Sequence, residues 1–128
     1  MMLDSSAVIA IVLREPEARA LVSAIDRAPV RIMSAVNWVE AMVVAESRRG
    51  AAEDVRLALA EFDVKLVAFD EKQALYAYQG WLRFGKGRHP AALNFGDCCA
   101  YAAAVTSGEP LLFKGDDFPR TDVTPAPW

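Results

Sequence analysis

Short apolar runs alternate along the chain with stretches whose apolar residues recur at helical spacing. Four runs, at residues 1–3, 30–33, 65–69 and 110–114, are typical of buried strands. Because helical segments separate them, the pattern predicts a mostly parallel α/β sheet. A short edge strand is also expected at residues 121–124, before two prolines end regular structure.

Residues that favour helix ends divide the segments between the strands. Ser34 is a good N-cap for a long helix, and Gly50 suits its C-terminal end. Pro16 suits the first turn of a helix, and Asp70 suits the N-cap of another. The expected helices cover residues 5–13, 16–26, 35–49, 52–62, 71–84 and 97–108.

Acidic residues stand where predicted strands end or predicted helices begin. Asp4 follows the first strand, Asp97 opens the last helix, and Asp116 and Asp117 follow the fourth strand. In open α/β sheets, ligands bind at the carboxyl ends of the strands. Taken singly, Asp4 and Asp97 are equally well explained as N-caps, and Gly115-Asp116-Asp117 as turn chemistry.

Glu40 is harder to explain by local structure. Helical spacing places it on the same face as Val36, Val39, Val43 and Val44, which we expect to point inward. A carboxylate on such a face is costly unless it is paired or bound to a metal. The alternatives are a partner arginine or a position at the rim of the buried face.

Together, these acids predict a site for a divalent cation. Hard divalent cations bind oxygen ligands, and Mg²⁺ takes one or two carboxylates directly and keeps several waters. Clustered carboxylates repel one another unless a cation neutralises them. His89 is the only histidine, so a two-histidine ribonuclease is excluded. The sequence also lacks a Gly-x-Ser-x-Gly elbow, a Gly-x-Gly-x-x-Gly loop and a Walker A motif.

Charge limits the kind of nucleic-acid contact. The net charge of −3 argues against a protein that coats nucleic acid, but it allows binding in one local groove. The candidate phosphate contacts are Lys86, Arg88 and His89 in a basic loop, together with Lys114. Ordinary solvated surface explains these basic residues equally well.

Length and cysteine usage indicate one domain in a reducing compartment. The 128 residues fit a single domain, 1–128, and 54% of them are hydrophobic. The two cysteines, Cys98 and Cys99, are adjacent and unsuited to an ordinary disulfide. The start, MMLDSS, does not read as a secretory signal. We therefore expect a cytoplasmic protein.

Three stretches carry a family resemblance. They are the start from Met2 to Ala7, the segment from Gly87 to Cys98 with Gly96-Asp97, and Leu111 to Phe118, together with Ser34 and Glu40. Over nearly its whole length the chain resembles the PIN-domain nucleases, and among them the VapC-type toxins of toxin–antitoxin pairs.

The resemblance implies a three-layer α/β/α sandwich and RNA cleavage dependent on Mg²⁺ or Mn²⁺. Asp4 and Asp97 match the family's direct metal ligands, and Glu40 matches a third acid of its active site. Many members carry Asp where this chain has Gly115, so Asp116 or Asp117 would supply the fourth acid. The implied partners are RNA, a cognate antitoxin and a second copy of the chain, in a homodimer or a larger toxin–antitoxin assembly.

Two rival functions use some of the same residues. A receiver-like phosphoacceptor domain also has acids at strand ends, a Mg²⁺ and a nearby lysine. It would not need Glu40 on an inward helix face, and Asp70 after the third strand reads as a helix cap. A catalytically inert module that only binds an antitoxin would not need the full set of acids.

Overall fold

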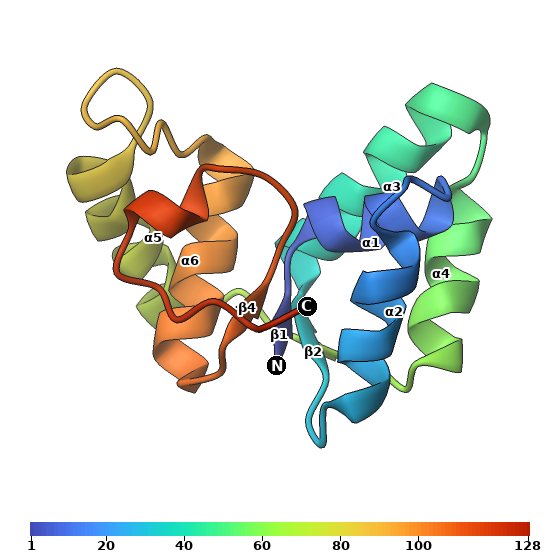
Figure 1. Cartoon of the computed structure of the whole chain (residues 1–128). Coiled ribbons are helices and arrows are strands. Elements are labelled where there is room, and N and C mark those ends of the chain that lie inside the picture. The colour runs from blue at the N-terminus through green and yellow to red at the C-terminus, as the bar shows by residue number, and fades with distance from the viewer.

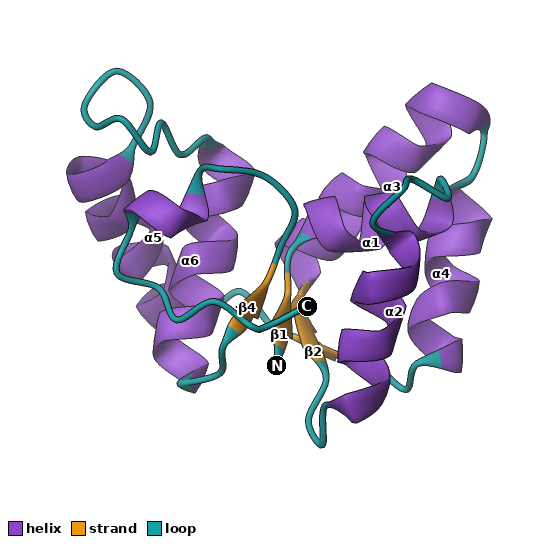
Figure 2. Cartoon of the chain, in the orientation of Figure 1, coloured by secondary structure: helices purple, strands orange, loops and turns teal.

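A four-stranded sheet forms the middle layer of the protein. In the computed structural model, which describes residues 1–128, the strands are β1 (Met2–Leu3), β2 (Ile32–Ser34), β3 (Lys65–Val67) and β4 (Leu111–Leu112). They lie in the order β3-β2-β1-β4, and every pairing is parallel. Figure 2 shows the short strands in the centre of the molecule, with helices on both sides. The predicted α/β/α sandwich with a parallel sheet is confirmed.

Helices cover both faces of the sheet and form two lobes above it (Figure 1). Four helices pack on one face and two on the other, and a short 3-10 helix follows the last strand. The first lobe has α1 (Ser5–Val12), α2 (Ala18–Arg27), α3 (Ala35–Arg49) and α4 (Ala52–Glu61), the second has α5 (Glu71–Phe84) and α6 (Phe95–Ser107), and the 3-10 helix is η1 (Phe118–Arg120).

Alternation along the strands divides the core in two. Leu3 and Leu112 belong to the hydrophobic cluster under α1–α4, whereas Met2 and Leu111 belong to the cluster under α5 and α6. Successive side chains of a strand point to opposite faces, so two-residue strands suffice to anchor both layers. Both faces are covered, which explains the apolar runs seen in the sequence.

Several predicted bounds were wrong by a few residues. The second helix begins at Ala18 rather than Pro16, which lies in the turn before it. The last helix begins at Phe95 with Asn94 as its N-cap, so Asp97 does not open it. The strands are also shorter than their apolar runs, because the ends of each run continue as loops.

The expected edge strand at residues 121–124 was also wrong. The C-terminal segment makes one isolated parallel bridge, between Leu111 and Pro125, and no strand. Leu111 donates its amide to Thr124 at 2.8 Å and accepts from the amide of Ala126 at 2.8 Å. A proline at the centre of this contact has no amide to extend the ladder.

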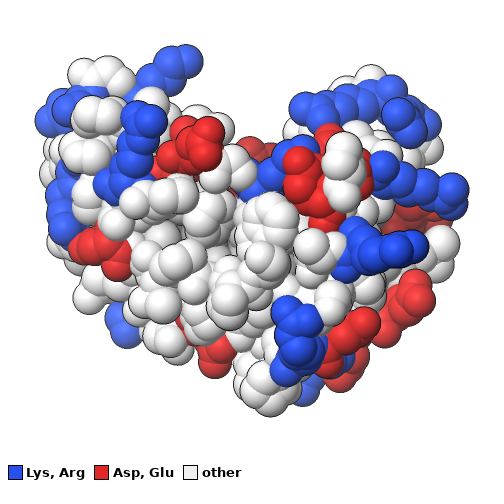
Figure 3. Space-filling view, viewed as in Figure 1, with Lys and Arg blue, Asp and Glu red and all other residues white.

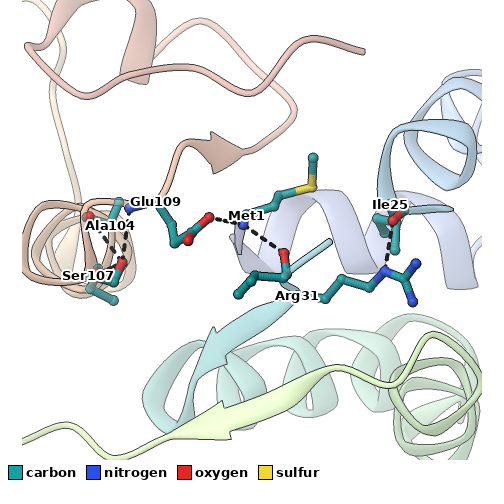
Figure 4. Close-up of polar contacts among 8 residues, drawn as sticks. Met1, Ile25, Arg31, Ala104, Ser107 and Glu109 are labelled. Atoms are coloured by element: carbon teal, nitrogen blue, oxygen red, sulfur yellow. Dashed lines mark hydrogen bonds and ion pairs between the residues drawn. The ribbon is translucent and has the colours of Figure 1, made fainter. Parts of the chain in front are cut away.

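The amino ends of the strands are held by polar contacts (Figure 4). The Met1 ammonium donates to the carbonyl of Val30 at 2.7 Å and pairs with the Glu109 carboxylate. Arg31 donates from Nε to the carbonyl of Ile25 at 2.9 Å. These contacts tie β1, β2 and the approach to β4 together at the edge opposite Asp4. None of the helices has the length and hydropathy that crossing a bilayer requires.

The packing of α2 gives a first testable prediction. Leu21 is on the buried side of α2 and is fully buried, so Leu21→Ala should lower the free energy of unfolding by about 2–5 kcal/mol through lost contacts and a cavity. Leu57→Ala on α4 is the matched control, because Leu57 is 51% exposed. Urea unfolding of both variants measures the difference. Equal losses would contradict the assignment of the core.

Candidate active site

Asp4 lies buried where β1 meets α1. It is 2% exposed, and its Oδ2 accepts from the Ser6 amide at 3.0 Å and from the Ser6 hydroxyl. Asp4 is therefore the N-cap of α1, which was one of the two interpretations of this residue in the sequence. Burial raises its pKa to about 7 against the lowering effect of the Ser6 contacts, and the charges of Asp97 and Glu40 raise it further. The same side chain thus caps a helix and faces two other acids.

Glu40 reaches this site from α3, but not for the reason expected. The buried face of α3 consists of Asn37, Ala41 and Ala45, whereas Val39 and Val43 are 54% and 59% exposed. The prediction of an inward valine stripe was therefore wrong for Val39 and Val43, whereas Val36 and Val44 are partly buried. Glu40 is half-buried at the rim of that face, which was the alternative interpretation.

The Glu40 carboxylate is held by donors from two helices. Its Oε2 accepts from the Ser5 hydroxyl at 2.7 Å and from Asn37 Nδ2 at 3.2 Å. Asn37 Nδ2 also lies 3.5 Å from Asp4 Oδ1. Ser5 and Asn37 were not singled out from the sequence, although Ser5 is next to Asp4 and Asn37 precedes Glu40 by one helical turn.

Asp97 occupies the first turn of α6. It completes a capping box, in which the Asn94 amide donates to Asp97 Oδ2 at 2.8 Å and the Asp97 amide donates to Asn94 Oδ1 at 2.9 Å. Desolvation raises the pKa of Asp97, against the lowering effect of the Asn94 amide, and the charges of Asp117 and Glu40 raise it further. Capping fixes the carboxylate at the end of the helix that meets Asp4 and Glu40.

The two acids of the last turn are not equivalent. Asp116 and Asp117 are both exposed, on the turn between β4 and η1. Only Asp117 is close enough to Asp97 for its charge to raise the pKa of that residue. Gly115 precedes them with a φ of 122°, a conformation that favours glycine.

Asp4, Glu40 and Asp97 share one cleft between the two lobes, whereas Asp116 and Asp117 do not line it. It encloses about 400 Å³ and is lined by Asp4, Glu40 and Asp97, with Glu15, Arg48 and Lys114 at its border. Figure 3 shows the molecule hollowed between the lobes, with Lys and Arg on both sides of the hollow and acidic residues between them. The cleft lies at the carboxyl ends of β1 and β4, as predicted for a ligand site.

Lys114 lines the cleft, but its ammonium is already paired with acids, whereas the sequence predicted a phosphate contact. Its ammonium pairs with Glu15 at 2.6 Å and with Glu17 at 2.9 Å, which raises the pKa of Lys114. Its backbone amide donates to Ser6 Oγ at 3.0 Å, so β4 is fastened to the start of α1. Arg48, which the sequence reasoning missed, lines the same cleft and contacts Glu15 at 3.5 Å.

The basic loop lies outside the carboxylate cleft. Arg88 places its guanidinium 4.5 Å from the centre of the Trp81 ring, and Lys86 lines a separate apolar pocket of about 460 Å³. His89 accepts from the Ala91 amide through Nδ1 at 3.1 Å. Asn94 lines both hollows, so the two are neighbours. The structure does not bring Lys86, Arg88 or His89 into the cleft with the acids.

The donor set suits a hard divalent cation. Carboxylate oxygens are the only charged ligands that Asp4, Glu40 and Asp97 offer, and their crowding is relieved by a positive charge. No three His, Cys, Asp or Glu side chains are grouped closely enough to enclose a metal by themselves. A cation that takes two carboxylates and keeps its waters, as Mg²⁺ does, fits this arrangement.

Comparison with known proteins identifies the family. The model of the PIN domain matches residues 1–123. The chain belongs to the PIN domain family. Ribonuclease VapC of Mycolicibacterium smegmatis is 47% identical over 96% of this chain and 97% of its own length. The chain therefore falls within the VapC group of PIN domains, as its sequence motifs indicated.

Two solved structures share the fold. VapC20 of Mycobacterium tuberculosis, described as a sarcin–ricin loop cleaving toxin, superposes with a TM-score of 0.80 at 14% identity, covering 99% of this chain and 98% of its own. A chain of a toxin–antitoxin complex from Klebsiella pneumoniae superposes with a TM-score of 0.74 at 18% identity, covering 99% and 97%. At these identities the likeness shows that the PIN fold is shared.

The raised pKa of Asp4 gives a prediction for the metal-free protein. The unfolded chain releases this proton near 3.8, but the folded protein holds it until about 7. Stability should therefore fall as the pH rises between these values, with a contribution of up to about 1.4 kcal/mol per pH unit. Asp4→Asn should remove that contribution and keep the helix cap, because Asn also caps. Urea unfolding in EDTA from pH 5 to 8 measures it.

Asp54→Asn is the control for this experiment. Asp54 is exposed on α4, so its removal should leave the pH dependence of wild type intact. If Asp4→Asn and wild type lose stability in parallel between pH 5 and 7, Asp4 does not hold a proton in the folded state.

Proposed function

We propose that the chain is a metal-dependent endoribonuclease, the toxin component of a toxin–antitoxin pair, that hydrolyses RNA phosphodiester bonds in the cleft between its lobes. The observation that carries the proposal is a fully desolvated carboxylate, Asp4, facing Asp97 and Glu40 at the carboxyl edge of the sheet. The chain belongs to the VapC group, and its relative from Mycolicibacterium smegmatis is named a ribonuclease, which supports the same activity.

The proposed roles follow from burial and contacts. Asp4 and Asp97 hold the cation, Mg²⁺ or Mn²⁺, because both are fixed at helix ends and both are desolvated. When bound, such an ion polarises a phosphate oxygen and lowers the pKa of a water. We assign the orientation of the attacking water to Glu40 and to Asp117, the two acids whose charges act on Asp97. Because water is the proposed nucleophile, the reaction does not require the 2′-hydroxyl of the RNA.

Arg48 is the best-placed phosphate contact in the cleft. Its side chain is 58% exposed and has one ion-pair contact, to Glu15 at 3.5 Å. The ammonium of Lys114 lies between two glutamates, which compensate its charge. We therefore propose that Arg48, rather than Lys114, contacts the scissile phosphate. Lys86, Arg88 and His89 of the neighbouring loop would contact flanking phosphates.

Partners and compartment follow from the same proposal. A cognate antitoxin would cover the acidic cleft, and the toxin–antitoxin complex of Klebsiella pneumoniae supports a partner of this kind. A homodimer is proposed because exposed apolar side chains, among them Val39, Val43 and Tyr78, remain on the single chain. The free, buried thiols of Cys98 and Cys99 suit the reducing cytoplasm.

The rival functions are less well supported. Asp70, the acid after β3, accepts from the Gln73 amide at 2.8 Å and caps α5, as expected of a structural residue. An inert antitoxin-binding module would leave the cost of burying Asp4 beside two other acids unexplained.

Removing one proposed metal ligand tests the function. Asp97→Asn keeps the capping geometry but removes a charge, and should lower kcat/KM for a single-stranded RNA in Mg²⁺ by at least about 100-fold. Asp54→Asn is the matched control and should cleave like wild type, because Asp54 is exposed on α4 and does not line the cleft. RNA cleavage by purified protein, with EDTA as a second control, measures the effect. Equal cleavage by both variants would refute the proposal.

The last turn offers a second test. Asp117→Asn should weaken Mn²⁺ binding and lower kcat more than Asp116→Asn, because only Asp117 influences Asp97 electrostatically. Calorimetric titration with Mn²⁺ and RNA cleavage assays measure the two effects separately. The opposite ranking would assign the fourth acid to Asp116.

A further inference from the structure

We propose that two uncharged residues, Gly96 and Asn37, are positioning residues that set the place of the Glu40 carboxylate in the active site. This rests on the proposed function, in which Glu40 acts on the attacking water. Gly96 provides the space that the carboxylate occupies, and Asn37 holds it there. We call this pair the Glu40 clamp.

Gly96 is the first half of the Glu40 clamp. It lies in the first turn of α6, and a Cβ added to it would come within 3.0 Å of both carboxylate oxygens and the carboxyl carbon of Glu40. Real Cβ atoms do not make such approaches. The φ of Gly96 is not positive, so backbone conformation does not require glycine here. The glycine is needed because the carboxylate from α3 rests directly on the α6 backbone.

Asn37 is the second half. It is fully buried, and its Nδ2 donates to Glu40 Oε2 at 3.2 Å and to the Gly96 carbonyl at 3.0 Å. One amide therefore joins α3 to the first turn of α6, across the two lobes. The opposite orientation of the amide would set an oxygen against two acceptors, so these contacts determine which way it points.

The orientation of Asn37 has a cost. Its Oδ1 is buried and has no hydrogen-bond partner. A buried acceptor without a partner is unfavourable, and an apolar side chain of similar size would fill the space without that cost. The donors of Asn37 are therefore the reason for an asparagine at this position.

The Glu40 clamp leaves one oxygen of Glu40 available. Ser5 and Asn37 both donate to Oε2, whereas no protein donor reaches Oε1. Oε1 is not a fully buried acceptor, and Glu40 lines the cleft. Glu40 is thus held through Oε2, and its Oε1 is left without a protein donor.

Gly96→Ala tests the first half. The clash falls on the far end of a flexible side chain, so Glu40 should turn away while the fold survives. Alanine also favours helix more than glycine does. We expect unchanged or higher stability, with Mn²⁺ affinity and kcat lowered about 10–100-fold, as for other residues that orient metal-site ligands. Calorimetry with Mn²⁺ and no RNA, urea unfolding and RNA cleavage give the three readouts.

Gly108→Ala is the matched control on the same helix. Gly108 ends α6 with a φ of 72° and has nothing near its Cβ position, so alanine there strains the backbone far from Glu40. It should lower stability and leave Mn²⁺ affinity as in wild type. Wild-type Mn²⁺ affinity and kcat in Gly96→Ala would overturn the proposal for Gly96.

A double-mutant cycle shows whether Gly96 acts through Glu40. In a Glu40→Ala background the clash has no partner, so adding Gly96→Ala should cause no further loss of Mn²⁺ affinity. An equal loss in both backgrounds would overturn the proposal. If Glu40→Ala itself leaves Mn²⁺ affinity and cleavage unchanged, the role of Glu40 in the proposed function fails. If Glu40→Ala weakens both and Gly96→Ala neither, only the Glu40 clamp fails.

Asn37→Ser tests the second half. Asn37 is fully buried and cannot touch RNA, so kcat should fall about 10–100-fold while KM stays within about twofold of wild type. Asn37→Leu, which has a similar size and no donor, should fall at least as far. A change in KM alone, or wild-type kcat in both variants once urea unfolding shows them folded, would overturn the role of Asn37.

Discussion

The cost of burying the Asp4 carboxylate governs the arrangement of the site. Asp4 follows a central strand covered on both faces, so its carboxylate is almost fully buried, and burial raises its pKa to about 7. Ser6 stabilises the charged form in part, whereas Asp97 and Glu40 oppose it. A site with this imbalance favours a cation, because only positive charge offsets the repulsion of acids held together by the fold.

The same constraint explains how the lobes are joined above the sheet. α3 and α6 come from opposite layers, and each contributes one acid to the cleft. Their approach is fixed by a glycine in α6 and a buried asparagine in α3 rather than by an ion pair. Uncharged residues thus join α3 to α6 beside the acids, and Asn37 itself adds no charge of either sign to the site.

Local signals in the sequence were sufficient for the architecture. Apolar runs predicted the four parallel strands, because strands covered on both faces are apolar throughout. Capping residues predicted the six helices, because each helix end favours particular residue types. The helix ends were predicted less accurately. Asn94, not Asp97, caps α6, because both asparagine and aspartate suit an N-cap position. The bridge at Pro125 also escaped prediction, because a single contact depends on how the C-terminal segment meets β4.

The sequence by itself determined that Asp4, Glu40 and Asp97 belong together, through strand-end placement and family motifs. The tertiary structure decided how they do so. It showed that Val39 and Val43 of α3 are exposed while Asn37 is buried, because the side of α3 that carries Asn37 packs against α1 and α6. It also showed that Asp117, and not Asp116, acts electrostatically on Asp97. The ammonium of Lys114 forms ion pairs with Glu15 and Glu17. Such outcomes depend on distances between segments far apart in the chain, which no local pattern encodes.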